Sequence, residues 1–212
     1  MSNGIIERLE ARIEALEEEV SALKGTAHPG GTLAISNPRQ RTRDEIVAKA
    51  KSDVEELMYL AGIGNSTPST KISGSLTVKF QVNNDKRTVV ALLFRKNIAT
   101  TEVRWRGIAK CAPNDVFNAH IGKAIALRRA LGLKVPTEYT NAPQPTEARV
   151  GDVVQVTSQG RITGTTMQLT KKCERYDSVG LGKAFYHTYD SGWLGDEQFD
   201  IIDDTVSTGG EA

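Results

Sequence analysis

The sequence predicts an α+β protein with three parts: an N-terminal coiled-coil helix, a small antiparallel β-sheet packed with a helix, and a C-terminal small all-β (SH3-like) module. Three observations predict it. A heptad pattern runs along residues 4–24, alternating strand patterns followed by a helix occupy residues 74–133, and short strand-like stretches with glycine turns follow residue 149. We expect boundaries at 1–25 (coiled-coil helix), 26–40 (linker), 41–135 (α+β core), 136–148 (proline-rich linker), 149–204 (β module) and 205–212 (flexible tail).

Composition indicates a folded cytoplasmic protein. The chain has 212 residues, of which 39% are hydrophobic and 25% are charged, with a formal net charge of +1. No apolar run is long enough for a membrane span, and the acidic N-terminus is unlike a secretory signal, so we expect no membrane partner. Cys111 and Cys173 stand far apart without metal-ligand spacing, which predicts two reduced thiols, no metal and no cofactor.

Charge is strongly segregated along the chain. Residues 71–134 hold 13 Lys and Arg against three acids, whereas seven acids and no Lys or Arg follow residue 183. The first 25 residues carry six glutamates against three bases. A basic middle between acidic ends predicts an anionic partner for the middle or internal pairing between the segments.

The N-terminal segments predict helices. In residues 4–24, apolar side chains recur at alternating three- and four-residue steps, which favours self-association as a coiled coil over docking on the chain's own core. A Gly-, Pro- and Ser-rich stretch follows as a linker. The sequence TRDE has the pattern of a capping box, with Thr42 as N-cap and Glu45 reaching back, and predicts that a second helix begins at Thr42.

The core pattern is three strands and a helix. Alternating residues in 75–82 predict a strand, the apolar run 87–94 predicts a central strand, and residues 101–111 predict a third strand with Trp105 facing away from Arg104 and Arg106. The helix that follows is capped by Asp115 or Asn118 and ends at Gly132 in the left-handed conformation.

Arg128 is the unusual residue of this helix. At about 100° per residue, it lies in the middle of the apolar face formed by Phe117, Ile121, Ala124 and Leu131, with Arg129 about 100° round the helix. A guanidinium there must snorkel, pair with a carboxylate or hold a bound anion. Two interpretations stay open: an internal ion pair with Asp115, and a phosphate site at a subunit interface.

No catalytic pattern accompanies these arginines. The sequence lacks a phosphate loop, a nucleophile elbow, a zinc-protease helix motif and a dinucleotide fingerprint, and its three histidines are widely separated. The stretch GLGKAF lacks the spacing of a phosphate loop and predicts a hairpin turn. We therefore expect a protein that is not an enzyme.

The stretch GIAKCAPNDVFNAHIGKAIALRRALG resembles the core motif of small phage and prophage proteins, in particular the first-type anti-Thoeris sponge family, over residues 74–133. The resemblance implies an oligomeric sheet-and-helix protein that sequesters cyclic ADP-ribose signals, and for some members cyclic oligonucleotides, without degrading them. It assigns the polar turn to Asn114 and Asp115 and the phosphate contact to Arg129. Ala112 departs from the polar residue that the family pattern has before Pro113.

Three hypotheses follow. In the first, an oligomer joined through residues 4–24 binds a cyclic nucleotide between subunits. Its expected ligand-binding residues are Arg104, Trp105, Arg106, Asn114, Asp115, Arg128 and Arg129, with Trp105 or Phe94 against a base. The alternatives are a phage nucleic-acid-binding accessory protein, which the basic middle favours, and a structural or protein-binding adaptor. For Trp105, burial in the core of the protein is the alternative to stacking on a base.

Overall fold

The computed structural model describes residues 38–64, 74–96, 102–158, 160–173, 185–188 and 192–205. The predicted coiled-coil helix at 1–25, nearly all of the linker at 26–40 and residues 206–212 of the predicted tail lie outside these ranges. The described residues have a mixed α+β fold with two antiparallel sheets, which confirms the predicted class. Both sheets belong to one compact unit, residues 36–212.

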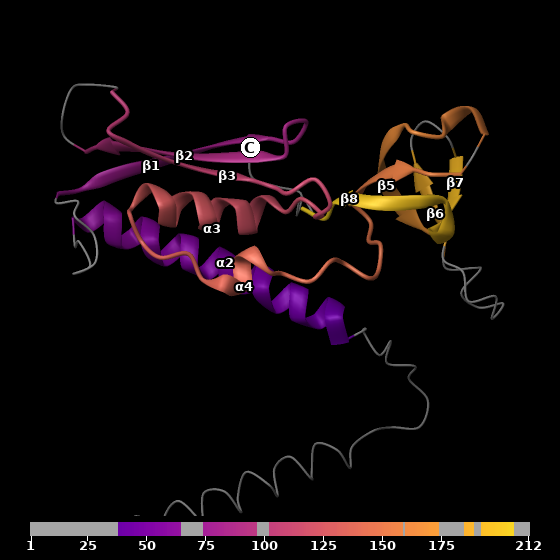
Figure 1. Cartoon of the computed structure of the whole chain (residues 1–212), viewed down its shortest axis with the longest axis horizontal. Coiled ribbons are helices and arrows are strands. Elements are labelled where there is room, and N and C mark those ends of the chain that lie inside the picture. Colours follow the sequence, from indigo (N-terminus) through magenta and orange to yellow (C-terminus); the bar gives the residue numbers. More distant parts are fainter. Residues whose placement is uncertain are drawn as a thin grey trace, which may run out of the picture. The chain divides into compact units, whose positions relative to one another are not determined.

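The first sheet is covered on one face by two helices. Its strands are β1 (Leu76–Asn83), β2 (Thr88–Arg95) and β3 (Trp105–Lys110), in the order β1-β2-β3, so the apolar run is the central strand as predicted. Helix α3 (Ala119–Ala130) packs across β2 and β3, and α2 (Pro38–Ile63) packs on α3 and β1. Figure 1 shows both helices on the same side of the sheet.

Helix α3 begins and ends where local signals place it. The Asn118 side-chain oxygen accepts hydrogen bonds from the backbone N–H groups of His120 (3.0 Å) and Ile121 (3.2 Å), so Asn118 is the N-cap. Gly132 follows the helix with φ of +72°, and the N–H of Leu133 closes the end on the Arg128 carbonyl (2.8 Å). The predicted apolar face is buried in the core.

A glycine in β3 sets how closely α3 approaches the sheet. A Cβ at Gly107 would overlap the carbonyl oxygen of Ala126 and lie 2.5 Å from the backbone nitrogen of Ala130. The helix backbone therefore rests directly on the strand backbone. This close approach draws the turn after β3 and the exposed side of α3 together.

Helix α2 starts earlier than the capping box predicts. It begins at Pro38, so Thr42 lies in its second turn and the predicted start at Thr42 is wrong. Proline suits a first helical turn because its φ is already fixed and its missing N–H would have had no helical partner. A capping-box pattern inside a helix is then only a coincidence of residue types.

The segment predicted as a proline-rich linker, residues 136–148, is anchored to the core. It contains a short helix, α4 (Thr137–Thr140), whose Tyr139 is buried in a cluster with Ala50, Ile121 and Ala124. The contacts of Tyr139 with α2 and α3 hold this segment against the helices. It is a structural part of the core and not a free spacer.

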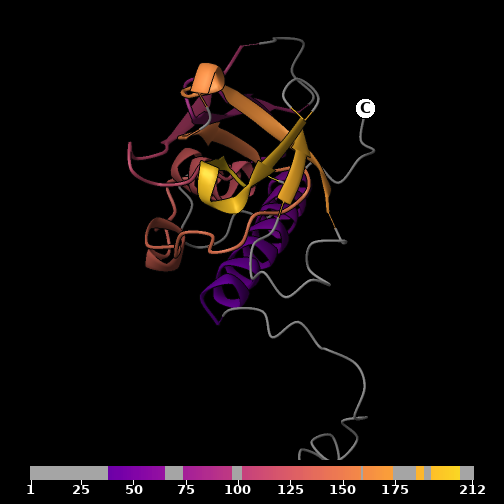
Figure 2. The ribbon, with the colours of Figure 1, turned by 90° about the vertical axis from the view of Figure 1, so that its right-hand side faces the viewer.

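The second sheet has its own apolar core. Its strands, in the order β7-β6-β5-β4-β8, are β4 (Val153–Val156), β5 (Thr166–Lys172), β6 (Phe185–Thr188), β7 (Gly192–Gly195) and β8 (Phe199–Asp203), with 3₁₀ turns η1 (Gly160–Ile162) and η2 (Asp196–Gln198). Figure 2 faces this sheet. Val154, Leu169 and Leu194 are among its fully buried side chains.

The end of β8 returns to the start of α3. Phe117 donates its N–H to the Ile202 carbonyl (3.0 Å) and accepts from the N–H of Asp204 (3.1 Å), which forms a short parallel bridge. The N–H of Ala119 donates to the Thr205 hydroxyl (2.7 Å). Thr205, predicted as the first residue of a flexible tail, is therefore fixed at a helix N-terminus, because its oxygen satisfies a donor that the helix itself leaves open.

Candidate functional site

A cavity of about 230 Å³ lies between the turn after β3, the outer side of α3 and the segment around α4. Apolar side chains form much of its wall: Ala109, Phe117, Ile121, Ile125 and Ala142. Lys110, Cys111, Asp115 and Arg129 also line it. Three segments that are separate in the sequence thus meet around one hollow, because Gly107 lets α3 sit close to β3.

Two of the predicted site residues meet at this cavity. Arg129 is exposed, and its Nη1 donates to the backbone carbonyl of Ile108 (2.5 Å), which fixes the guanidinium beside the end of β3. Asp115 accepts from the side-chain amide of Gln144 (2.9 Å), whose own oxygen accepts from the N–H of Val116 (2.8 Å). A cation and a carboxylate that stand 14 residues apart are therefore held in defined positions on one rim.

The cavity combines an apolar wall with an excess of positive charge. Lys110 and Arg129 line it, against the single carboxylate of Asp115 among its lining residues, while the charge of the buried lining residue Arg43 is matched by Asp204. An anion placed there would meet guanidinium and ammonium donors, and Asp115 has acceptor capacity beyond its bond to Gln144. The arrangement suits a small anionic molecule that also carries hydroxyl groups and an apolar part.

The structure also shows Cys111 at the cavity. The Arg87 Nη2 donates to the Cys111 sulfur (3.2 Å), and the thiol lies 3.6 Å from the Asp115 carbonyl oxygen that accepts from it. Cys111 and Cys173 are both free thiols. No group of His, Cys, Asp or Glu side chains suited to a metal ion occurs in the part of the chain that the structure describes.

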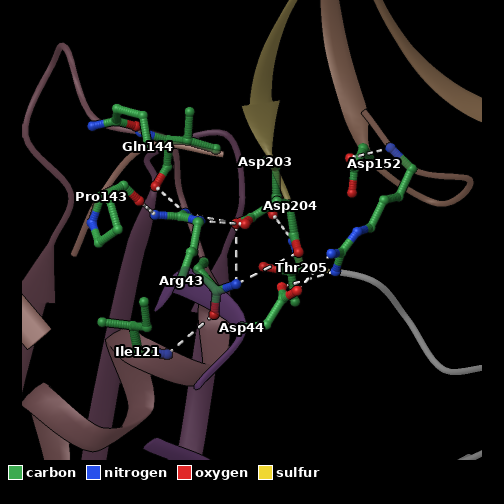
Figure 3. Close-up of polar contacts among 12 residues, drawn as sticks. Arg43, Asp44, Ile121, Pro143, Gln144, Asp152, Asp203, Asp204 and Thr205 are labelled. Atoms are coloured by element: carbon green, nitrogen blue, oxygen red, sulfur yellow. Dashed lines mark hydrogen bonds and ion pairs between the residues drawn. The ribbon is translucent and has the colours of Figure 1, made fainter. Parts of the chain in front are cut away.

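Arg43 is a site residue that the sequence did not indicate. Its side chain is 2% exposed, and its Nε and Nη2 bind the two carboxylate oxygens of Asp204 (2.5 and 2.8 Å). Its Nη1 donates to the Pro143 carbonyl (2.6 Å). Figure 3 shows Arg43 pointing at Asp204, with Asp203 and Thr205 beside it. The excess of acids after residue 183 is the sequence signal that could have indicated an acidic partner for Arg43, since Asp204 is one of those acids.

Arg128 serves the interior and lies outside the set of residues that line the cavity. Its Nε and Nη2 bind Asp53 of α2 at 2.6 and 2.5 Å, and the side-chain hydrogen bond with Asp53 raises the pKa of Arg128. Tyr139 donates to the same carboxylate (3.3 Å), and burial followed by the Asp53 charge raises its pKa to about 12. The predicted ion pair of Arg128 with Asp115 is wrong, because α2 brings Asp53 to the place where the apolar face needs a counter-charge, and the predicted ligand contact of Arg128 stays a prediction.

The remaining predicted residues lie elsewhere. Trp105 is half-buried and packs on the core of the first sheet, in agreement with its alternative role. Arg104 and Arg106 are exposed on the opposite face of β3, and Arg104 forms an ion pair with Glu102 at 3.6 Å. Asn114 is exposed in the turn beside the cavity but does not line it. Phe94, half-buried on β2, is likewise absent from the lining.

A second, polar cavity of about 250 Å³ lies beyond Asn118 and Asp204. Burial and then the charges of Lys51 and Lys123 lower the pKa of His120 there to about 4. Asp152 is 1% exposed, accepts from the N–H of Arg149 (2.8 Å), and its other oxygen has no hydrogen-bond partner among the described residues. Burial raises the pKa of Asp152 to about 6.

Comparison of the chain with models of protein families, with curated proteins and with solved structures finds no significant match. Among the described helices, none has both the length and the apolar character that crossing a membrane requires.

Proposed function

We propose that the protein is a non-enzymatic, phage-type protein that binds and sequesters a cyclic nucleotide immune signal. The observation that carries this proposal is the meeting of Arg129 and Asp115 at one cavity with an apolar wall. These are two of the three residues to which the resemblance assigns ligand contacts. A guanidinium can bind the phosphate of such a ligand, and a carboxylate can accept hydrogen bonds from its ribose hydroxyls.

The size of the cavity indicates how the ligand is held. Pockets for whole drug-sized ligands measure about 300–1,000 Å³, and this cavity measures about 230 Å³. One ribose phosphate fits such a volume, and a complete cyclic dinucleotide does not. We therefore propose that the rest of the ligand lies against a second copy of the chain, and that residues 4–24 join the copies as a coiled coil.

We also propose a role for the second sheet and a place where the protein acts. The five-stranded second sheet with its own core supports an SH3-like module that is fastened to the core through Arg43 and Asp204. The protein acts in the cytoplasm of the host cell, where the signal is made. No cofactor takes part, since the role is to hold the signal intact.

The test uses the purified full-length protein. It is mixed with cyclic ADP-ribose isomers and cyclic dinucleotides, desalted, heated to unfold it, and the released molecules are weighed by mass spectrometry. Release of one unmodified ligand supports the proposal. Release of a cleaved product shows an enzyme, and retention of none of the molecules refutes nucleotide sequestration.

A further inference from the structure

The face of the first sheet opposite the helices has an ordered arrangement of side chains. The strand register places Lys79, Leu92 and Arg106 in one row across the sheet, then Gln81, Val90 and Ile108, then Asn83, Thr88 and Lys110. Because side chains alternate between the two faces of a strand, all nine lie on the face turned away from α3. Phe94 and Thr77 form the row on the other side of Lys79.

This face is open and basic. The residues that it contributes from β1 and β3 are exposed, and Ile108 is 45% exposed. None of the three described strands contains an Asp or Glu, whereas Lys79, Arg106 and Lys110 stand on the two strands that flank the centre. In Figure 1, α2 and α3 both lie against the opposite face of this sheet. A second copy of the same face would be repelled, because its cations would oppose these cations.

The apolar part of the face is narrow: it follows β2 and is widened in one row by Ile108 of β3. Val90, Leu92 and Phe94 follow β2, and neighbouring strands lie about 4.8 Å apart. A docked helix is about 10 Å across and would also cover the polar side chains of both flanking strands. A base needs only one side chain to stack on, such as Phe94, and the amides of Gln81 and Asn83 can hydrogen-bond to base edges. The geometry therefore favours nucleic acid over an acidic helix.

We propose that this sheet face binds single-stranded nucleic acid. Lys79 and Arg106, one on each side of Leu92, neutralise backbone phosphates, while bases lie along Val90, Leu92 and Phe94. The Lys79 ammonium already lies over the Phe94 ring, 5.6 Å from its centre, so a base stacked on Phe94 sits next to a cation. The proposal is independent of the nucleotide cavity, since the two sites share only Lys110.

The test measures binding of the full-length protein to a fluorescein-labelled oligo(dT) of about 12 nucleotides by fluorescence anisotropy. With two phosphate contacts, from Lys79 and Arg106, the affinity should fall with salt at a log–log slope of about −1.4. Lys79→Glu/Arg106→Glu should weaken binding at least about tenfold and flatten this slope. Phe94→Leu keeps an apolar side chain of similar size but removes the ring, and should weaken binding by a smaller factor.

A matched control separates this face from general charge. Arg161→Glu/Lys171→Glu makes the same change in net charge at exposed positions of the second sheet and should leave oligonucleotide binding intact. Arg129→Ala should also leave it intact, and Lys79→Glu/Arg106→Glu should keep any nucleotide captured by the cavity. Failure of one site is then distinguishable from failure of the other.

Three outcomes would overturn the proposal. The wild-type protein could fail to bind the oligonucleotide at low salt, or the control variant could lose binding as much as Lys79→Glu/Arg106→Glu does. In the third, poly-L-glutamate binds at this face and the oligonucleotide does not, which identifies a docking surface for acidic protein segments. Circular dichroism of each variant verifies that the fold is retained.

Discussion

Arg128 of α3 and Asp53 of α2 form a two-point ion pair in which both oxygens of the carboxylate accept from one guanidinium. The Asp53 side chain is 10% exposed, and the Tyr139 hydroxyl donates to it as well. The pair joins the two helices that cover the first sheet. It explains how an arginine can occupy the middle of an apolar helix face, since its charge is matched from the neighbouring helix.

Arg128→Ala should destabilise the fold. The change leaves the Asp53 carboxylate nearly buried without its main partner, and we expect the free energy of unfolding to fall by about 2–4 kcal/mol in urea denaturation. Asp53→Asn on the Arg128→Ala background should cost little more, because the stranded charge is gone. If the double variant loses as much stability as the Arg128→Ala and Asp53→Asn single variants lose in sum, the two residues do not act as a pair.

Arg129→Ala should abolish ligand capture and leave stability nearly unchanged, whereas Arg128→Ala should lower stability. Arg129 is exposed and donates a hydrogen bond to the Ile108 carbonyl, so we expect the free energy of unfolding to change by less than about 1 kcal/mol. Capture of a cyclic nucleotide, measured by mass spectrometry after desalting, should be lost. Retention of the ligand by Arg129→Ala at wild-type levels would remove this arginine from the site.

Arg43→Met should weaken the attachment of the second sheet to the core. The change preserves much of the side-chain volume but removes both guanidinium donors from the Asp204 carboxylate, which keeps the Asn118 amide (3.0 Å), and the donor to the Pro143 carbonyl, at a cost of about 3–5 kcal/mol. We expect faster hydrogen exchange in β8 and in the first turn of α3, measured by mass spectrometry. Unchanged protection of both segments would show that the Phe117 bridge and the Ala119–Thr205 hydrogen bond hold them together without Arg43.

Local structure in this chain could be predicted and long-range pairing could not. Asn118 and Gly132 mark the ends of α3 by rules that involve only a few neighbouring residues, and the central position of β2 follows from its apolar run. The partners of Arg43 and Arg128 are 161 and 75 residues away, respectively. Spacing in the sequence cannot choose among acids at such distances, and Asp115 was the wrong choice for Arg128.

The residues around the cavity show the same difference between local signals and long-range contacts. Asp115 and Arg129 were selected through the resemblance, and the structure places both at one cavity. The sequence also predicts Arg104 and Arg106 for this site because both are close to the same turn, but Arg106 lies on the other face of β3 and Arg104 precedes that strand. Which face a strand residue serves depends on where the helices pack, and that is decided by contacts such as the one at Gly107.

Asp152→Asn should change how stability depends on pH. Burial raises the pKa of Asp152 from 3.8 to about 6, so the folded state holds this proton more tightly than the unfolded state does. The resulting stabilisation is complete below pH 4 and is lost as the pH rises through about 6; two pH units correspond to about 3 kcal/mol. The stability of Asp152→Asn minus that of the wild type should therefore increase by about this amount between pH 4 and pH 7.

Other groups near Asp152 do not obscure this test. The pKa of His120 is lowered to about 4, which makes stability fall as the pH drops from 6.5, the opposite direction from Asp152. Burial also raises the pKa of Asp203. Both contributions are present in the wild type and the variant, so they largely cancel in the difference. Asp200→Asn, at an exposed position on β8, is the matched control for the loss of one carboxylate.

Gly107→Ala should be among the most damaging single-methyl changes in the chain. The added Cβ would overlap the Ala126 carbonyl oxygen and press on the Ala130 nitrogen, and both belong to a helix backbone that cannot rotate away. We expect a loss of about 3 kcal/mol or more in thermal or urea unfolding, with α3 pushed off the sheet. Gly62→Ala is the matched control, since a Cβ there meets nothing within 4 Å and alanine favours a helix by about 1 kcal/mol. If both variants unfold like the wild type, α3 does not lie against β3 as closely as the geometry requires.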